Sequence, residues 1–305
     1  MAVTLTQLRA FAAVAEAGSV HLAARRLYVS QPSVSAAVAA LGKELGVGLV
    51  ERSGRGIRLT GAGEAFLPYA TQVLGLLERG REAAQEVAMP ERRRLHLVAV
   101  NTAGEYLVPA LIDAYRRRYP ETDVSLEIGN RRVVLDRIAS HTADVGIGGR
   151  PIAKGVAGEP FLDNDLVLVG KETGPDLAEA TWLLREEGSG TRATAERFLA
   201  ELGVEPSVVL TLGSNGAVKQ ALSLGLGVTL ISELAVAAEL ESGELVRIPA
   251  AGTPISRPWY ALVAEGVPQR PAVKQFLAFL RSPEARDAVR RVAATDGGSP
   301  GSPRR

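Results

Sequence analysis

The first forty residues place apolar side chains at the period of an α-helix, in three short segments. A residue that can cap a helix precedes each segment, and these residues are Thr4, Ser19 and Ser30. Gln7 stands three residues after Thr4, which is the spacing of a capping box, and Gly18 ends the first segment. The pattern predicts three short helices. Because a tight turn joins the second to the third, it also predicts a helix-turn-helix.

A basic turn follows in residues 51–60, ERSGRGIRLT, where glycines separate Arg52, Arg55 and Arg58. This pattern predicts a hairpin, or wing, beside the three helices. Residues 19–60 contain six basic side chains and two acidic ones, whereas the whole chain has a net charge of only +1. A local positive surface of this kind suits a polyanion such as DNA. A solvated basic turn is the simpler alternative, and the neighbouring helix-turn-helix argues against it.

Residues 61–90 predict one long helix in which apolar side chains recur at every seventh position. Such a heptad pattern favours pairing with a second copy of the helix. Pro68 and Gly80 weaken the helix, so the pairing should be imperfect. The alternative is that these side chains pack on their own domain. The residues expected between two paired copies are Phe66, Tyr69, Val73 and Leu76.

Strands alternate with helices from residue 91 to residue 294, which indicates α/β architecture. The pattern predicts one strand in FLDNDLVLVG, and helices from Leu107 to Arg117, around Leu135 to His141, and from Pro271 to Arg281. The order of the elements fits a two-lobed domain, with lobe I about 91–158 and 257–294, and lobe II about 159–256. Residues 295–305 lack core-forming side chains, and we expect them to be disordered. With the winged helix-turn-helix in residues 1–60, the predicted fold is an α+β multidomain chain.

Composition argues against several classes of protein. There is no cysteine, which excludes disulfides, thiolate metal sites and thiol redox sensing. The three histidines lie far apart, and the common hydrolase and nucleotide-binding motifs are absent, so we expect no enzyme, no cofactor and no metal. The N-terminus does not resemble an export signal, and no apolar run has the length of a membrane span, so a cytoplasmic location is expected. Two lobes alone would suit a solute-binding protein, but the first 90 residues argue against it.

Residues 18–70 closely resemble the DNA-binding segment of LysR-type transcriptional regulators. The residues that match the family's spacing are Ala23, Ala24, Leu27, Ser30, Gln31, Pro32, Val34, Ser35, Leu41, Leu45, Gly46, Arg52, Leu59, Thr60, Ala62 and Gly63. The resemblance implies a winged helix-turn-helix that binds a double-stranded DNA operator. It also implies a homodimer or homotetramer, with RNA polymerase as a further partner.

The resemblance assigns DNA contacts to the third helix and the wing. Where the family commonly carries long polar side chains after Val-Ser, this chain has Ala36 and Ala37. We therefore expect few base contacts and more reliance on the wing and on DNA shape. The expected DNA-binding residues are Gln31, Pro32, Ser33, Ser35, Arg52, Arg55 and Arg58.

Three later segments, residues 100–109, 184–192 and 212–232, resemble the subgroup that regulates carbon fixation and sulfur and cysteine metabolism. In the second segment GSGTR opens a helix, where backbone N–H groups, two hydroxyls and Arg192 could hold an anion. The alternative is a helix cap, with Arg192 paired to Glu186, Glu187 or Glu196.

With this resemblance, the expected effector-binding residues are Asn101, Thr102, Gly148, Ser189, Gly190, Thr191, Arg192 and Asn215. Helix capping is the alternative for Thr102 and Asn215, and a tight hinge turn for Gly148. The sequence therefore predicts a LysR-type regulator whose operator binding is modulated by a small anionic metabolite bound between two lobes.

Overall fold

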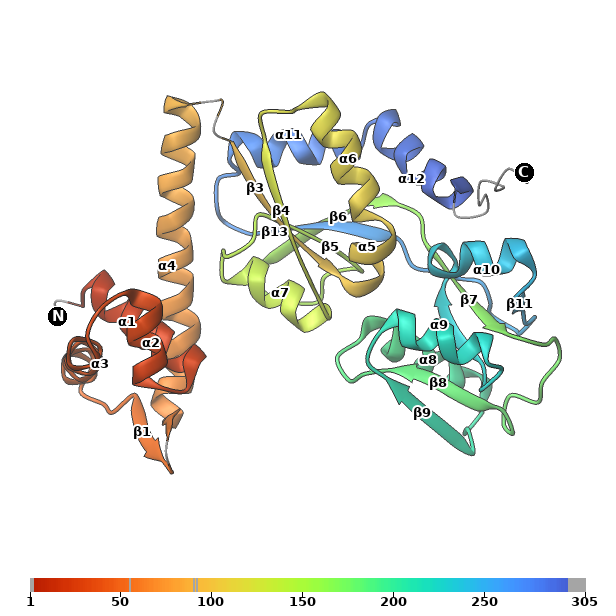
Figure 1. Cartoon of the computed structure of the whole chain (residues 1–305), viewed down its shortest axis with the longest axis horizontal. Helices are drawn as coiled ribbons and strands as arrows, with labels where there is room; N and C mark the ends of the chain where they lie inside the picture. The colour runs from red at the N-terminus through yellow and green to blue at the C-terminus, as the bar shows by residue number, and fades with distance from the viewer. Residues whose placement is uncertain (1–2, 55, 90, 92, 296–305) are drawn as a thin grey trace, which may run out of the picture. The chain divides into compact units, whose positions relative to one another are not determined.

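A computed structural model describes residues 3–54, 56–89, 91 and 93–295. The chain divides into two units, Met1–Ala84 with Ser140–Thr142, and Gln85–Ala139 with Ala143–Arg305. Figure 1 labels their helices and strands. In the described residues, no helix combines the length and the apolar character needed to cross a membrane.

The first unit is a helix-turn-helix with a wing. Its elements are α1 (Leu5–Ala17), α2 (Val20–Leu27), α3 (Gln31–Leu45), β1 (Val50–Ser53), β2 (Gly56–Leu59) and most of α4 (Gly61–Ala88). The capping box at Thr4 and the caps at Ser19 and Ser30 are confirmed. Phe11 and Leu41 are fully buried in the core that holds the three helices together. A side chain at Gly63 would overlap the Leu49 carbonyl, so this position at the start of α4 requires glycine.

Lobe I of the second unit is built on a five-stranded sheet in the order β4-β3-β5-β13-β6, whose first three strands are parallel (Figure 1). These strands are β3 (Arg94–Val100), β4 (Asp123–Gly129), β5 (Val145–Gly148), β6 (Val156–Leu162) and β13 (Trp259–Ala264). The helices of this lobe are α5 (Asn101–Tyr106), α6 (Val108–Arg118), α7 (Arg131–Ala139), α11 (Pro271–Leu280) and α12 (Pro283–Thr295). The core between the sheet, α6 and α11 contains Tyr115 and Phe276, whose rings contact edge to face.

Lobe II contains two small sheets with helices packed against them. Its strands are β7 (Asp165–Gly170), β8 (Thr181–Arg185), β9 (Val208–Leu212), β10 (Thr229–Ser232), β11 (Val246–Arg247) and β12 (Ile255–Ser256). Its helices are α8 (Gly190–Leu202), α9 (Asn215–Ser223), η2 (Glu233–Val236) and α10 (Ala237–Ser242). Trp182 lies in the core beneath α8 and contacts Phe198.

The structure differs from the sequence-based expectation at four places. FLDNDLVLVG, expected as one strand, is divided between β6 and β7, because the chain crosses from lobe I to lobe II at residues 163–164. The helix expected from Leu107 to Arg117 is α6, but the short helix α5 before it was not predicted, and His141 lies beyond the end of α7. Helix α12 was not predicted. The expected disorder of residues 295–305 concerns residues outside the described part of the chain, apart from Thr295, the last residue of α12.

Candidate functional site

The N-terminal turn of α3 presents the residues expected to read DNA. The Ser30 hydroxyl accepts a hydrogen bond from the Ser33 backbone N–H at 3.3 Å, which fixes the start of the helix. Gln31, Pro32, Ser33 and Ser35 are all exposed. Gln31 Nε2 lies 2.8 Å from His21 Nδ1 on α2, so the preceding helix orients the amide that would face a base.

The wing is the antiparallel hairpin β1–β2. Arg52 and Arg58 are exposed on it, and Arg58 forms an ion pair with Glu51 at 2.7 Å. Arg55, the third expected arginine, lies outside the described residues. Tyr28, which the sequence reasoning missed, occupies the turn before α3 in the left-handed conformation and is 96% exposed. Its position beside the N-terminus of α3 suits a contact with the DNA backbone.

The heptad residues of α4 separate into two groups. Phe66 packs within its own domain, with its ring centroid 5.8 Å from that of Phe11, which agrees with the alternative stated for it. Tyr69, Val73 and Leu76 are 68%, 49% and 47% exposed. These three therefore remain available on the surface of the helix.

In the second unit, a small cavity of about 30 Å³ lies between the two lobes. Five of the expected effector residues line it, and they are Asn101, Thr102, Ser189, Gly190 and Thr191. The first two lie at the start of α5, directly after β3, and the last three at the N-terminus of α8. The segments that follow β3 in lobe I and β8 in lobe II thus meet at this cavity.

Three expected effector residues do not line this cavity. Gly148 is buried in β5, where a Cβ would lie 3.2 Å from Val100. Arg192 extends along α8, where Nε donates to Glu196 at 2.7 Å and Nη1 to the Arg185 carbonyl at 3.1 Å. This is one of the pairings named as the alternative for Arg192. Asn215 is 1% exposed and lies behind the cavity.

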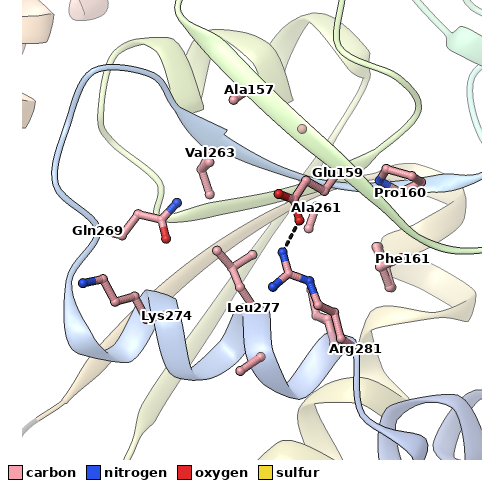
Figure 2. Close-up of a pocket in the computed structure, with 13 residues that line it drawn as sticks. Ala157, Glu159, Pro160, Phe161, Ala261, Val263, Gln269, Lys274, Leu277 and Arg281 are labelled. Atoms are coloured by element: carbon pink, nitrogen blue, oxygen red, sulfur yellow. Dashed lines mark hydrogen bonds and ion pairs between the residues drawn. The ribbon is translucent and has the colours of Figure 1, made fainter.

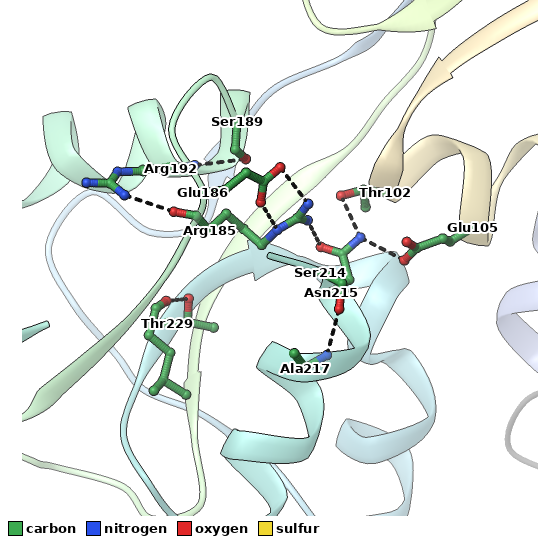
Figure 3. A network of polar contacts seen from close by, with 11 residues as sticks. Thr102, Glu105, Arg185, Glu186, Ser189, Arg192, Ser214, Asn215, Ala217 and Thr229 are labelled. Carbon is green, nitrogen blue, oxygen red and sulfur yellow. Dashed lines mark hydrogen bonds and ion pairs between the residues drawn. The ribbon is translucent and has the colours of Figure 1, made fainter. Parts of the chain in front are cut away.

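Asn215 and Arg185 form a polar network that joins the lobes (Figure 3). Asn215 Nδ2 donates to Glu105 at 2.9 Å and to the Thr102 hydroxyl at 3.3 Å, and its carbonyl accepts from Arg185. Arg185 also pairs with Glu186, and the Asn101 amide, oriented to satisfy both its partners, accepts from Arg185 at 2.6 Å. Each nitrogen of the Arg185 guanidinium therefore donates to a protein group.

The cavity also has lining residues that the sequence reasoning missed. They are Val100, Asn130, Arg131, Gly149, Arg185, Glu186, Arg257 and Trp259. Three of these are arginines and one is a glutamate, so the ionised side chains around the cavity carry an excess of positive charge. Arg257 lies where the chain crosses between β12 and β13, and no local motif marks it in the sequence.

Arg257, at the crossing between the lobes, differs from Arg185 of lobe II, although both line the cavity. Within the part of the chain that the structure describes, its guanidinium has no hydrogen-bond or ion-pair partner, although the side chain is half-buried. Burial, together with the positive charges of Arg131 and Arg197, lowers the pKa of Arg257 to about 10. An anion in the cavity would relieve this unfavourable environment.

A larger cavity of about 470 Å³ lies within lobe I, between β6, β13 and α11 (Figure 2). Apolar side chains such as Val263 and Leu277 form much of its wall, and an exposed ion pair between Arg281 and Glu159 crosses it. It contains none of the residues expected to bind the effector. Its larger volume alone therefore does not make it the functional site. The smaller cavity has the arginines and the helix N-terminus that suit an anion.

Comparison with known proteins agrees with this geometry. The family described as "LysR substrate binding domain" matches residues 89–283, and "Bacterial regulatory helix-turn-helix protein, lysR family" matches residues 5–64. The transcriptional activator CmpR of Synechocystis is 33% identical, over 91% of this chain and 94% of its own length. A RuBisCO operon transcriptional regulator of Acidithiobacillus ferrooxidans is 35% identical, over 91% and 93%.

Solved structures of the same kind are also similar. CbnR, a LysR family regulator, superposes with a TM-score of 0.65 at 25% identity, covering 95% of this chain and 99% of that one. The regulatory domain of Synechocystis CcmR in complex with 2-PG gives a TM-score of 0.57 at 30% identity, covering 62% of this chain and 95% of that one. The prediction of a regulator rather than an enzyme is confirmed, because the relatives are named as transcriptional regulators. The chain belongs to the LysR family of bacterial helix-turn-helix transcription regulators.

Proposed function

We propose that this regulator changes its operator binding in response to a small oxyanion held between lobes I and II. The observation that carries the proposal is the convergence, on one cavity, of the α8 N-terminus and an excess of arginine side chains. A helix N-terminus presents unpaired N–H groups and a partial positive charge, and both favour an anion. Ser189 and Thr191 add hydroxyls on one side, and Asn101, Thr102 and Asn130 add polar groups on the other.

The size of the cavity supports a coupling between binding and lobe movement. A volume of about 30 Å³ is far below the roughly 300 to 1,000 Å³ of typical ligand sites. The lobes must therefore separate to admit a metabolite and close again around it. A ligand that binds one lobe arrangement better than another shifts the population towards that arrangement. This shift is the physical basis we propose for the change in operator binding.

The relatives support the class of ligand. Two are named RuBisCO operon transcriptional regulators, and the regulatory domain of CcmR was solved in complex with 2-PG. A small acid related to 2-PG is therefore the first ligand class to test for this chain. The same relatives support a role inside the cell, where operators are found.

For the DNA-binding domain, we propose that α3 enters a major groove, with the wing on the phosphates. Gln31 would contact a base, and Arg52 and Arg58 would contact the backbone. Two α4 helices would pair through Tyr69, Val73 and Leu76 in a dimer, or in a tetramer of two dimers. Leu76→Asp would place like charges between the helices and should dissociate the pair, which sedimentation would detect. An intact dimer of this variant would exclude that pairing surface.

The test of effector binding is a thermal-shift titration with 2-PG, inorganic phosphate and sulfate, followed by footprinting of the operator. A ligand that binds only the folded state raises the melting temperature by mass action. We expect at least one of these anions to raise it and to alter the footprint. Absence of any shift with all three anions would contradict the proposed ligand class, and an unchanged footprint would contradict the coupling.

A further inference from the structure

We infer that residues 257–259, where the chain returns from lobe II to lobe I, receive the anionic group of the effector, with Arg257 and Trp259 as its donors. This inference rests on the proposed function and identifies the group that makes the anion bridge the lobes. It makes Arg257 the main cation that binds the anion, and Arg257 lies outside the glycine-rich segment at residues 188–192.

The backbone of this segment is fixed at the junction of the lobes. Arg257 N–H donates to the Asn164 carbonyl at 2.7 Å, and Asn164 Nδ2 donates to the Arg257 carbonyl at 3.2 Å. Asn164 belongs to the other crossing between the lobes, and Ser232 donates to its side-chain oxygen. The two crossings are therefore tied together at Arg257. A side chain rooted there can face both lobes whether they are open or closed.

Two glycines, one from each lobe, make room for the guanidinium. A Cβ on Gly190, the first residue of α8, would overlap Arg257 Nη2. A Cβ on Gly149, which follows β5, would lie 2.9 Å from the same nitrogen. Any larger residue at either position would displace the Arg257 side chain. The absence of side chains at Gly149 and Gly190 is thus explained by the place of the arginine.

This position is electrostatically unfavourable without a ligand. The guanidinium lies against the N-terminus of α8, so a full positive charge faces the positive end of a helix dipole. Arg131 adds a second cation, and both line the same cavity. Uncompensated positive charge therefore lies beside the cavity at the junction of the lobes. An oxyanion bound there would interact favourably with these groups, and it would favour the lobe arrangement that binds it best.

Trp259 supplies an independent indication of a missing acceptor. It is among the residues that line the same cavity and also packs in the core of lobe I, and its buried indole Nε1 has no hydrogen-bond partner among the described residues. A buried donor left unpaired costs roughly 1 to 3 kcal/mol, so such groups usually have a functional explanation. An oxygen of the bound anion would satisfy Nε1 and the neighbouring guanidinium together.

The experiment measures the affinity of the full-length protein for 2-PG and for inorganic phosphate by calorimetry. Arg257→Gln should weaken binding about tenfold or more, because it removes a charge-assisted contact. Arg257→Lys should restore part of the affinity. Gly190→Ala keeps every charge but fills the space of the guanidinium, and it should also weaken binding. Gly216→Ala is the matched control, since Gly216 also lies in the first turn of a helix but a Cβ there would meet only the Ser214 hydroxyl, at 4.0 Å.

Tryptophan fluorescence reports directly on residues 257–259. The chain has two tryptophans, so Trp182→Phe leaves Trp259 as the single indole. We expect the fluorescence of this variant to change on adding the anion, and Arg257→Gln in the same background to abolish the change. If the wild type binds no anion, the proposed function fails and this inference fails with it. If the wild type binds but Arg257→Gln and Gly190→Ala bind equally well, only the inference is overturned.

Discussion

Two arginines of the second unit, Arg270 and Arg257, occupy opposite electrostatic situations. Arg270 is 3% exposed and pairs with Glu86 and with Asp144, the latter at 2.6 Å. Arg257 is less deeply buried, but among the residues that the structure describes its guanidinium has no partner. A charge that the protein itself neutralises holds the fold together. A charge that it leaves uncompensated indicates a place for a ligand.

The environment of Arg270 explains why its pairing is structural. Glu86 belongs to the last turn of α4, and its second carboxylate oxygen accepts from the Ala272 backbone N–H at 3.2 Å. Asp144 precedes β5 and accepts from the His96 N–H at 2.7 Å. Arg270 thereby fastens the end of α4 to lobe I. Because both carboxylates are also buried, removing the guanidinium would leave them without their counter-charge.

The largest expected effect is therefore on Arg270. Arg270→Met should lower the free energy of unfolding by about 3 to 5 kcal/mol, because it leaves two buried carboxylates unpaired. Denaturant unfolding followed by circular dichroism measures it. Glu86→Gln, which leaves Arg270 paired with Asp144, should cost less. Equal stability of Arg270→Met and wild type would remove the distinction between the two arginines.

For Arg257 we expect the opposite result in the absence of ligand. Arg257→Gln removes a cation that faces other positive groups, so its free energy of unfolding should change by less than about 1 kcal/mol or rise slightly. The same denaturant series, without added anion, measures this change. A destabilisation as large as that of Arg270→Met would mean that Arg257 has a structural partner instead of a ligand.

Arg192, on α8, can be compared with Arg257 for its effect on anion binding. Its guanidinium already donates to Glu196 and to the Arg185 carbonyl, so Arg192→Ala should weaken anion binding by less than about threefold, in contrast to Arg257→Gln. Calorimetry with 2-PG compares the two variants under one condition. A loss of tenfold or more for Arg192→Ala would restore the sequence-based expectation for that residue.

The smallest effect concerns an arginine that is neither buried nor part of the cavity. Arg52 is exposed on the wing, so Arg52→Ala should weaken operator binding and flatten the salt dependence by about one unit of slope. Binding isotherms at several salt concentrations measure the slope. Arg247→Gln, an exposed arginine of lobe II, is the control for loss of one charge and should leave the slope unchanged.

Local patterns in the sequence predicted the local structure well. Thr4 with Gln7, Ser19 and Ser30 each satisfy the backbone of the helix that follows, so a few neighbouring residues were enough to locate three helices. The first part of strand β6 was missed because Gly158 and Pro160 interrupt the apolar alternation, and its position at the edge of the sheet tolerates both.

Only part of the cavity could be predicted, because only part of it is formed by a local sequence motif. Ser189, Gly190 and Thr191 form a recognisable helix start, so they could be identified from the sequence. Arg257 lies far along the chain from Gly190, and nothing near it indicates that the two meet. Arg192 was favoured because it follows the glycines directly, but an acidic side chain one helical turn away holds its guanidinium. Which cation faces the cavity is decided by tertiary packing.

The most direct test of the account compares operator affinity with and without saturating 2-PG in the wild type and in Arg257→Gln. The account predicts that the two unliganded proteins bind the operator equally well, since Arg257 lies outside the DNA-binding domain. It also predicts that 2-PG changes the affinity of the wild type but not that of the variant at the same concentration. An equal response of both proteins to 2-PG would contradict the claim that Arg257 receives the effector.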